Sequence, residues 1–206
     1  TTEIYTLSLH DALPILINYG AGNLASVINA IEKIGYKTEI IQQPKQIINV
    51  DKIVIPGVGH AGRAMLNLHE SGLANALKSS KKPTLGICLG MQLMGKYSDE
   101  GNTECLGVMN FDVNKLNINL KTPHMGWNRI EIAPNPLFTG IPNNTWVYFV
   151  HSYYVAANEN SIAKCNYETS ICTAVNQGNY WGVQFHPEKS GECGIQIIKN
   201  FIELCE

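Results

Sequence analysis

The sequence predicts an α/β fold, built as a mixed, largely parallel sheet with helices on both faces and an antiparallel, strand-rich second half. In the first half, strand-like apolar runs alternate with helical patterns, which is typical of parallel sheets covered by helices. In the second half, short strand-like segments follow one another with short loops between them. The 206 residues contain no internal repeat or linker, so one domain with a sizeable core is expected.

Composition narrows the range of partners and compartments. The formal net charge of −2 gives no reason to expect a nucleic acid or a membrane as a partner, and no apolar run is long enough to span a bilayer. The six cysteines form no Cys-x-x-Cys pair and no zinc-like spacing with histidine, so no metal site is expected. Scattered cysteines in one domain predict a reduced, cytoplasmic protein.

The first fourteen residues do not fit the pattern that follows them. They start without methionine, show no clear periodicity, and lack the basic start and apolar core of a signal peptide. We expect residues 1–14 to be a non-native extension and residues 15–206 to form the domain.

The elements of the first half follow from apolar spacing and turn residues. Asn23 is a plausible N-cap, and the apolar residues after it recur at helical spacing until Gly35. A second helical stretch is interrupted at Ser71-Gly72. The expected strands are residues 15–19, 38–41, 52–55 and 82–87, and the expected helices are residues 24–34, residues 61–79 and a helix that begins at Leu89.

The segment around Cys88 is the most informative part of the chain. In Gly86-Ile87-Cys88-Leu89-Gly90 a cysteine lies between two glycines, where a strand should end and a helix begin. This Gly-x-nucleophile-x-Gly pattern holds a nucleophile at the top of a sheet, where the positive end of the helix favours the reactive thiolate. A buried structural cysteine is the alternative, but the flanking glycines favour a nucleophile.

A base for this nucleophile is found near the other end of the chain. Residues 181–185 alternate like a strand, and His186 and Glu188 follow at its exit with Pro187 between them. A carboxylate at this spacing can bond one ring nitrogen of the histidine and leave the other to face Cys88. We therefore expect a triad of Cys88, His186 and Glu188.

A glycine-rich turn after the expected strand 52–55 is a candidate oxyanion hole. The backbone N–H groups of Gly57 and Val58, in Pro56-Gly57-Val58-Gly59, could stabilise a developing negative charge together with the N–H of Leu89. For an isolated turn, ordinary turn chemistry is the more common interpretation.

The second half is expected to contain strands at residues 107–113, 127–132, 146–156, 162–167 and 171–185, with a hairpin turn at 177–179 inside the last of these. An amphipathic helix at residues 192–204 closes the chain. Ligands in such sheets bind beyond the carboxyl ends of the parallel strands, where Cys88 lies.

Several motifs carry a resemblance to a known family. The segments 86–92 and 182–188 resemble the class I (triad) glutamine amidotransferases. Segments 18–24, 56–59, 124–128 and 149–154 narrow the resemblance to the glutaminase subunits of imidazole glycerol phosphate synthase, from about residue 15 to the C-terminus. The resemblance implies a flavodoxin-like amidotransferase fold and a heterodimer with a cyclase subunit in histidine biosynthesis.

The resemblance also implies a reaction that needs no cofactor. Cys88 attacks the side-chain amide of L-glutamine, His186 carries the proton and Glu188 orients His186. Ammonia leaves, and water then releases glutamate from the thioester. The peptide at Gly57 and Val58 matches the oxyanion strand of this family.

Further positions match residues that bind substrate or the partner subunit. The positions that match substrate contacts are Gln92, Glu100, Ser152 and Tyr153. The positions that match the face toward the cyclase are Asn23, Trp127, Tyr148 and Lys189.

Three alternatives remain open at this point. Another amidotransferase subunit, such as that of anthranilate synthase or CTP synthetase, shares the Cys88 motif but not the segments 126–128 and 151–154. A free-standing γ-glutamyl hydrolase would act without a partner. A non-enzymatic binding module would be expected to lose Cys88, His186 or Glu188, and all of these are present.

Overall fold

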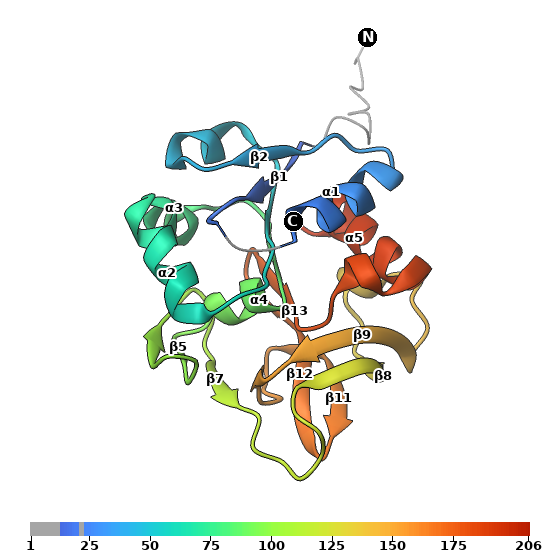
Figure 1. Cartoon of the computed structure of the whole chain (residues 1–206). Coiled ribbons are helices and arrows are strands. Elements are labelled where there is room, and N and C mark those ends of the chain that lie inside the picture. Colours follow the sequence, from blue (N-terminus) through green and yellow to red (C-terminus); the bar gives the residue numbers. More distant parts are fainter. Residues whose placement is uncertain (1–12, 21–22) are drawn as a thin grey trace.

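Two sheets make up the framework of the computed structural model, which describes residues 13–20 and 23–206 (Figure 1). The strands of the larger sheet are β1 (Pro14–Ile17), β2 (Glu39–Ile41), β3 (Lys52–Ile55), β4 (Thr84–Ile87), β8 (His124–Ile132), β9 (Thr145–His151), β11 (Ser161–Tyr167), β12 (Thr169–Gln177) and β13 (Tyr180–Val183). Within the described residues their order is β2-β1-β3-β4-β13-β12-β11-β8-β9.

The larger sheet is parallel at one end and antiparallel at the other. Strands β2, β1, β3, β4 and β13 pair in parallel. All pairs from β13 to β9 are antiparallel. The predicted mixed sheet is confirmed, and β13, from the second half of the chain, inserts beside β4 in the parallel part.

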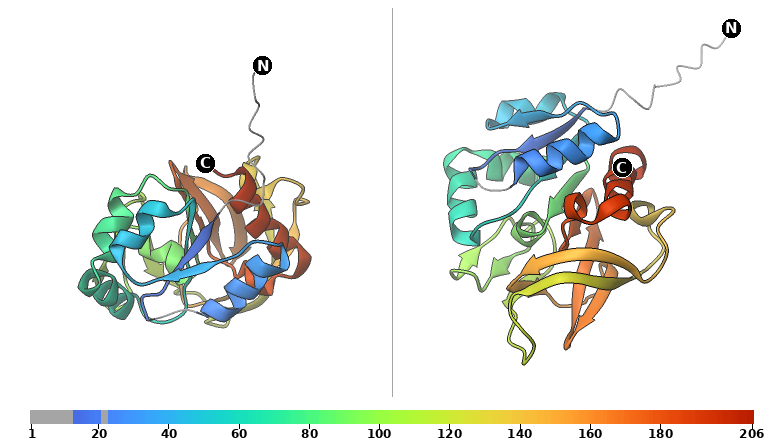
Figure 2. Two further views of the ribbon diagram at one scale, coloured as in Figure 1. Left: turned by 90° about the horizontal axis from the view of Figure 1, so that it is seen from above. Right: turned by 45° about the vertical axis from the view of Figure 1, so that its right-hand side comes forward.

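Helices cover both faces of the parallel part, as predicted (Figures 1 and 2). The helices are α1 (Leu24–Lys33), α2 (Ala61–Glu70), α3 (Leu73–Ser79), α4 (Leu89–Leu93) and α5 (Gly191–Leu204), with short 3₁₀ turns η1 (Pro44–Asn49), η2 (Pro136–Phe138) and η3 (Pro187–Lys189). Leu16 and Val54 pack in a core with α1 and α5, whereas their neighbours Ile15 and Ile53 pack in a core with α2, α3 and α4. This alternation follows from the two-residue period of a strand.

Several predicted boundaries are confirmed. Asn23 caps α1, because its Oδ1 accepts a hydrogen bond from the N–H of Ser26 at 3.3 Å. The expected interruption of the helix at residues 61–79 separates α2 from α3, where Gly72 has φ 76°. The expected hairpin turn joins β12 to β13 around Gly178, which has φ 59°. Residues 21 and 22, which precede the Asn23 cap, lie outside the described residues.

Of the extension predicted for residues 1–14, the structure describes only residues 13 and 14, because residues 1–12 lie outside the described residues. Pro14 corrects that prediction at its boundary, since it belongs to β1 and pairs with Lys52 of β3. Leu13 also contacts this region, because its N–H donates to Asp51 Oδ2 at 3.0 Å. The strand therefore begins one residue earlier than its apolar pattern, because proline at the first position of a strand is tolerated.

A second, smaller sheet was not predicted. Its strands are β5 (Tyr97–Ser98), β6 (Thr103–Glu104), β7 (Asp112–Lys115) and β10 (Tyr153–Val155), in the order β10-β7-β5-β6. The prediction of a strand at 107–113 is wrong over most of its length, because Gly107 has φ 66° and regular pairing begins only at Asp112.

The prediction of one strand over 146–156 is also wrong. The chain leaves the larger sheet at His151, and after Ser152 it pairs with β7 of the smaller sheet. The carbonyl of Ser152 accepts from the N–H of Leu116 at 2.9 Å, which ties the crossing point to the end of β7. The extended pattern continues through Ser152, so the sequence carries no sign of the change of sheet.

Close backbone packing surrounds the turn from β4 to α4. A Cβ atom at Gly90 would overlap the carbonyl oxygen of Ile55, and one at Gly57 would overlap the backbone of Gly90. A Cβ atom at Gly86 would lie 2.5 Å from the N of Met91. These glycines therefore permit α4 to lie directly against β3 and β4.

Gly90→Ala should lower the free energy of unfolding, because the added methyl group meets backbone that cannot move aside. We expect a loss of about 1–3 kcal/mol or more in urea denaturation, as for other overpacked sites. The matched control is Gly62→Ala in α2, where the nearest atom to an added Cβ is the side-chain Oγ1 of Thr103 at 3.2 Å. The control should change stability by less than about 1 kcal/mol. Equal effects of the two variants would contradict the close packing described at Gly90.

Candidate active site

Cys88 occupies the turn between β4 and α4 with an uncommon backbone conformation. Its φ is 52° and its ψ is −108°, a region that costs a residue with a side chain about 1–3 kcal/mol. The N–H of Cys88 donates to the carbonyl of Val183 at 2.7 Å, and its carbonyl accepts from the N–H of Gln92 at 3.2 Å. These bonds hold the strained residue between the sheet and the first turn of α4.

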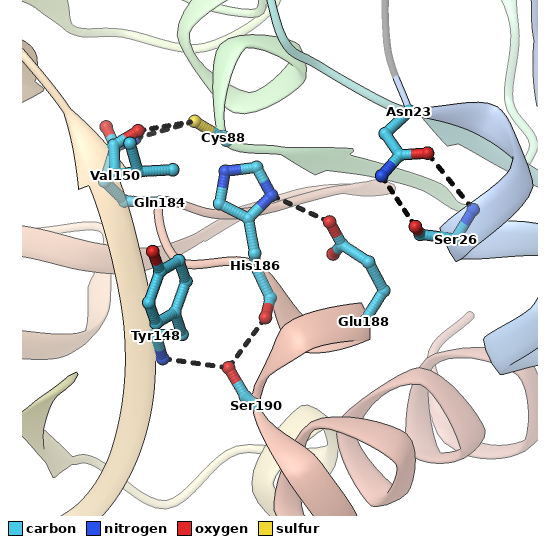
Figure 3. Close-up of polar contacts among 9 residues, drawn as sticks. All are labelled: Asn23, Ser26, Cys88, Tyr148, Val150, Gln184, His186, Glu188 and Ser190. Atoms are coloured by element: carbon cyan, nitrogen blue, oxygen red, sulfur yellow. Dashed lines mark hydrogen bonds and ion pairs between the residues drawn. The ribbon is translucent and has the colours of Figure 1, made fainter. Parts of the chain in front are cut away.

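His186 follows β13 and is fixed from several sides (Figure 3). Its Nδ1 lies 2.8 Å from Glu188 Oε1, and both side chains are 2% exposed. Its N–H donates to the carbonyl of Tyr148 on β9 at 2.9 Å. Ser190 Oγ donates to the carbonyl of His186 at 2.7 Å and accepts from the N–H of Tyr148 at 3.0 Å. The imidazole therefore has a defined position, with its Nδ1 hydrogen directed at Glu188.

The second ring nitrogen of His186 is directed toward Cys88 (Figure 3). Within the described part of the chain, this buried Nε2 has no hydrogen-bond partner. Burial lowers the pKa of His186, but the contacts with Cys88 and Glu188 outweigh burial and raise it to about 10. The site thus favours an imidazolium opposite the Cys88 sulfur.

The sulfur opens onto a cavity of about 290 Å³ between the two sheets. Its lining residues are Gly57, Val58, Gly59, Cys88, Leu89, Gln92, Glu100, Pro123, Val150, His151, Ser152 and Tyr153. The structure therefore brings the candidate nucleophile, the candidate oxyanion residues and the candidate substrate residues to one pocket. His186 and Glu188 are buried and do not line this cavity. A larger depression of about 820 Å³ beside η2 contains none of these residues.

Two of the candidate substrate residues also bond within the protein. Glu100 Oε2 accepts from the N–H of Ala61 at 2.7 Å, which holds this carboxylate against the first residue of α2. Gln92 Nε2 donates to the carbonyl of Tyr153 at 2.9 Å. Both side chains are thus held in place at the wall of the pocket.

Gln184 is a site residue that sequence analysis missed. It is completely buried, and its Nε2 lies 3.6 Å from Cys88 Sγ. Its Oε1 accepts from Gln92 Nε2 at 2.9 Å. The alternation of residues 181–185 shows Gln184 as a polar position of a strand. That pattern cannot distinguish a buried polar residue from an exposed one.

The candidate partner residues fall into two places. Trp127 is 53% exposed, and its ring meets that of Tyr148 edge-on with centroids 6.0 Å apart. Lys189 Nζ lies 6.0 Å from the centroid of the Tyr148 ring, so these three form one cluster on the surface. Asn23 is instead engaged with Ser26 at the start of α1, where its Nδ2 lies 2.6 Å from Ser26 Oγ.

The described residues contain neither a cluster of metal ligands nor a helix that could span a membrane. There, no three or more histidine, cysteine, aspartate or glutamate side chains gather so that they could hold a metal ion. None of the described helices combines the length and the apolar character that crossing a membrane requires.

Comparison with known sequences identifies close relatives. The family described as Glutamine amidotransferase class-I matches residues 15–204. The imidazole glycerol phosphate synthase subunit HisH of Bacteroides fragilis is 44% identical over 192 residues, which is 92% of this chain and 98% of the relative. Subunit HisH 1 of Vibrio vulnificus is 46% identical over 198 residues, covering 92% of this chain and 97% of the relative. HisH of Haemophilus influenzae is 45% identical over 190 residues, covering 91% of this chain and 96% of the relative.

Solved structures of lower sequence identity share the fold. A putative GMP synthase subunit from Thermoplasma acidophilum has a TM-score of 0.74 at 19% identity, covering 95% of this chain and 94% of that one. PurLQS from Thermotoga maritima has a TM-score of 0.69 at 15% identity, covering 95% of this chain and 99% of that one. With residues 15–204 matched and relatives that are 44–46% identical over nearly their whole length, the chain belongs to the class I glutamine amidotransferase family and, within it, to the HisH subunits of imidazole glycerol phosphate synthase.

Proposed function

We propose that this chain is the glutaminase subunit of an imidazole glycerol phosphate synthase. It hydrolyses L-glutamine to glutamate and ammonia and delivers the ammonia to a cyclase subunit in histidine biosynthesis. The observation that carries the proposal is Cys88 at the wall of a pocket, with the buried pair of His186 and Glu188 beside it, in a chain with HisH relatives. Each of these residue types has a defined task in acyl transfer through a thioester.

The first half of the reaction forms a thioester and releases ammonia. The Cys88 thiolate attacks the side-chain carbonyl carbon of glutamine, and the carbonyl oxygen becomes an oxyanion. The N–H groups of Val58 and Leu89 are the candidate donors to this oxyanion, with Gly57 supplying the turn. The tetrahedral intermediate collapses to the γ-glutamyl thioester as His186 gives its proton to the leaving nitrogen, so ammonia departs.

The second half of the reaction regenerates the thiolate. A water molecule attacks the thioester while His186, now neutral, takes a proton from that water. The second tetrahedral intermediate releases the Cys88 sulfur and leaves glutamate as product. Glu188 keeps the imidazole in one tautomer throughout, because it bonds Nδ1 at 2.8 Å.

The remaining pocket residues suit the amino-acid end of glutamine. The carboxylate of Glu100 is the candidate partner of the α-ammonium group. The backbone of Ser152 and Tyr153 provides the candidate contacts to the α-carboxylate. Gln92 lies between these groups and Cys88.

The proposed cyclase face lies directly against the triad. Trp127, Tyr148 and Lys189 form its surface cluster, and Asn23 extends the face at the start of α1. The carbonyl of Tyr148 accepts from the N–H of His186, so β9, which carries one residue of this cluster, is bonded directly to the segment that carries His186 and Glu188. We place the reaction in the cytoplasm, since all six cysteines are free, as is usual in reducing compartments.

Cys88→Ala should abolish glutamine hydrolysis and leave the fold intact. Loss of the nucleophile should reduce kcat by at least about 10⁴-fold, measured as glutamate release in the presence of the cyclase. Synthesis from added ammonium salts should persist, because the later chemistry needs no thiol. The matched control is Cys193→Ala, a free cysteine outside the pocket, which should keep full activity. Glutaminase activity above trace levels in Cys88→Ala would refute the mechanism.

The isolated chain should be a poor glutaminase that becomes active in the complex. The turn at Gly57 and Val58 must aim an N–H at the oxyanion, and a missing donor costs about 10²–10³ in kcat. Glutamate release is measured for the chain alone, with the cyclase, and with the cyclase and its ribonucleotide ligand. Equal rates in all three conditions would favour a free-standing hydrolase instead. Lys189→Glu should weaken the activation by the partner more than it lowers the residual rate of the chain alone.

Glu188→Gln should change the pH dependence of stability. Against the lowering effect of burial, Cys88 and Glu188 raise the pKa of His186 to about 10. The folded state therefore holds this proton more tightly than the unfolded chain, and the resulting stabilisation is full below about pH 6.5 and lost as the pH rises through about 10. The free energy of unfolding of wild type and variant, from urea denaturation, should differ most at about pH 6 and least at about pH 10. A difference that stays constant over this range would show that Glu188 does not raise the pKa of His186.

A further inference from the structure

A pair of buried histidines lies beside the pocket and has no task in the proposed reaction. His124 is 3% exposed and His151 is 5% exposed. They face each other across β8 and β9, with His124 Nδ1 3.0 Å from His151 Nε2. His151 also lines the pocket, at the point where β9 leaves the larger sheet.

The hydrogen bonds of this pair have one consistent direction. A backbone carbonyl can only accept, so His151 Nδ1 must carry the hydrogen that it shares with the carbonyl of Tyr153 at 2.9 Å. In a neutral ring His151 Nε2 is then the acceptor, and His124 Nδ1 must donate to it. His124 Nε2 is left to accept from Asn128 Nδ2, at 3.3 Å. Every nitrogen of the two rings thus has a partner when both rings are neutral.

Burial keeps both rings neutral. It lowers the pKa of His124 to about 4. Burial, together with the neighbouring His124, lowers the pKa of His151 to about 3. An added proton would place two hydrogens in the short contact between the rings, so the neutral pair is the arrangement that this geometry supports.

The pair ends at a carbonyl that also serves the active site. The oxygen of Tyr153 accepts from His151 Nδ1 and from Gln92 Nε2, both at 2.9 Å. Gln92 Nε2 also donates to Gln184 Oε1, and Gln184 Nε2 lies 3.6 Å from Cys88 Sγ. The backbone at Tyr153 is therefore held from two sides within the pocket wall.

The other end of the pair, at His124, is held by ring stacking and by Asn128. The His124 ring is stacked between Phe149 and Tyr167, with centroid distances of 4.7 and 3.9 Å. Asn128, its hydrogen-bond donor, also donates to the carbonyl of Asn166 at 3.3 Å. His124 thus has little freedom to turn, and it presents its Nδ1–H to His151 in one orientation.

We propose that His124 and His151 are positioning residues that hold the Ser152–Tyr153 backbone in the geometry that receives the α-carboxylate of glutamine. The chain changes sheets at Ser152. The residues up to His151 pair with β8 and those from Tyr153 pair with β7, so the strand pairing of neither sheet spans Ser152. The side chain of His151 closes this turn onto Tyr153, and His124 fixes the tautomer that makes the bond possible. This inference rests on the proposed glutaminase function.

The test compares His124→Phe with His124→Asn in the complex with the cyclase. Phenylalanine keeps the stacked ring but has no group that can donate to His151. Asparagine loses the stack, but its amide can donate from nearly the position of Nδ1. The matched control is Tyr167→Phe, which keeps the ring stacked on His124, removes the hydrogen bond from the Tyr167 hydroxyl to the carbonyl of Lys121, and leaves the hydrogen bonds of the two histidines untouched.

We expect His124→Phe to raise the KM for glutamine by about tenfold, with kcat changed by less than about threefold. His124→Asn should have a KM closer to that of wild type than His124→Phe has, although it should be the less stable of the two variants in urea denaturation. Tyr167→Phe should leave the KM unchanged. Two results would overturn the positioning role. One is a higher KM in His124→Asn than in His124→Phe, which would mean that the KM reflects only the loss of stability. The other is an unchanged KM in His124→Phe.

The tautomer is tested separately on the free full-length chain. Nitrogen-15 NMR should show His151 neutral and protonated at Nδ1 near pH 7, and His124→Phe should give a mixture of tautomers. A wild-type His151 protonated at Nε2 would overturn the inference. This measurement needs no glutamine, so it separates a failure of the pair's role from a failure of the proposed function. In that second case wild type would not hydrolyse glutamine at all.

Discussion

The fit of α4 against β3 and β4 is the constraint on which the site depends. Cys88 adopts a positive φ that costs free energy, and the close backbone packing around its turn holds it in this conformation. Gly57, Gly86 and Gly90 have no side chains where these backbones approach one another. The cost of the strained turn is offset by bonds such as that from the Cys88 N–H to Val183. The result is a sulfur presented at the carboxyl edge of the parallel strands.

The insertion of β13 beside β4 explains how residues nearly a hundred positions apart meet. Val183 lies opposite Ile87 in a parallel register, so the residues after both strands emerge at the same edge. Cys88 follows β4 directly, and His186 follows β13 by three residues. The antiparallel hairpin of β8 and β9 then packs against η3, where Tyr148 bonds to both His186 and Ser190. The exposed cluster of Trp127, Tyr148 and Lys189 is therefore a direct neighbour of His186.

Buried polar side chains give the pocket wall its defined shape. Gln92, Gln184, His124 and His151 are all nearly inaccessible to water, where an unpaired polar group is costly. Each of them has at least two polar contacts within the protein. A network satisfied in this way favours one arrangement of side chains over its alternatives, because any rotation leaves a buried group without a partner. These hydrogen bonds, and not apolar packing alone, position the side chains of this part of the pocket wall.

Local patterns in the sequence were sufficient to predict the elements of the parallel half and to propose a candidate triad. Strand and helix periods, the Asn23 cap and the turn at Gly178 depend on neighbours within a few residues, so they can be recognised without the fold. Cys88, His186 and Glu188 could be proposed because a nucleophile, a base and an orienting carboxylate require one another. Only the tertiary structure decided that the strand ending at His151 changes sheets at Ser152. It also decided that Gln184 and His124 are buried and paired. The physical reason is that alternation describes one strand, whereas the sheet it joins and the groups that cover its polar residues are set by segments far away in the chain.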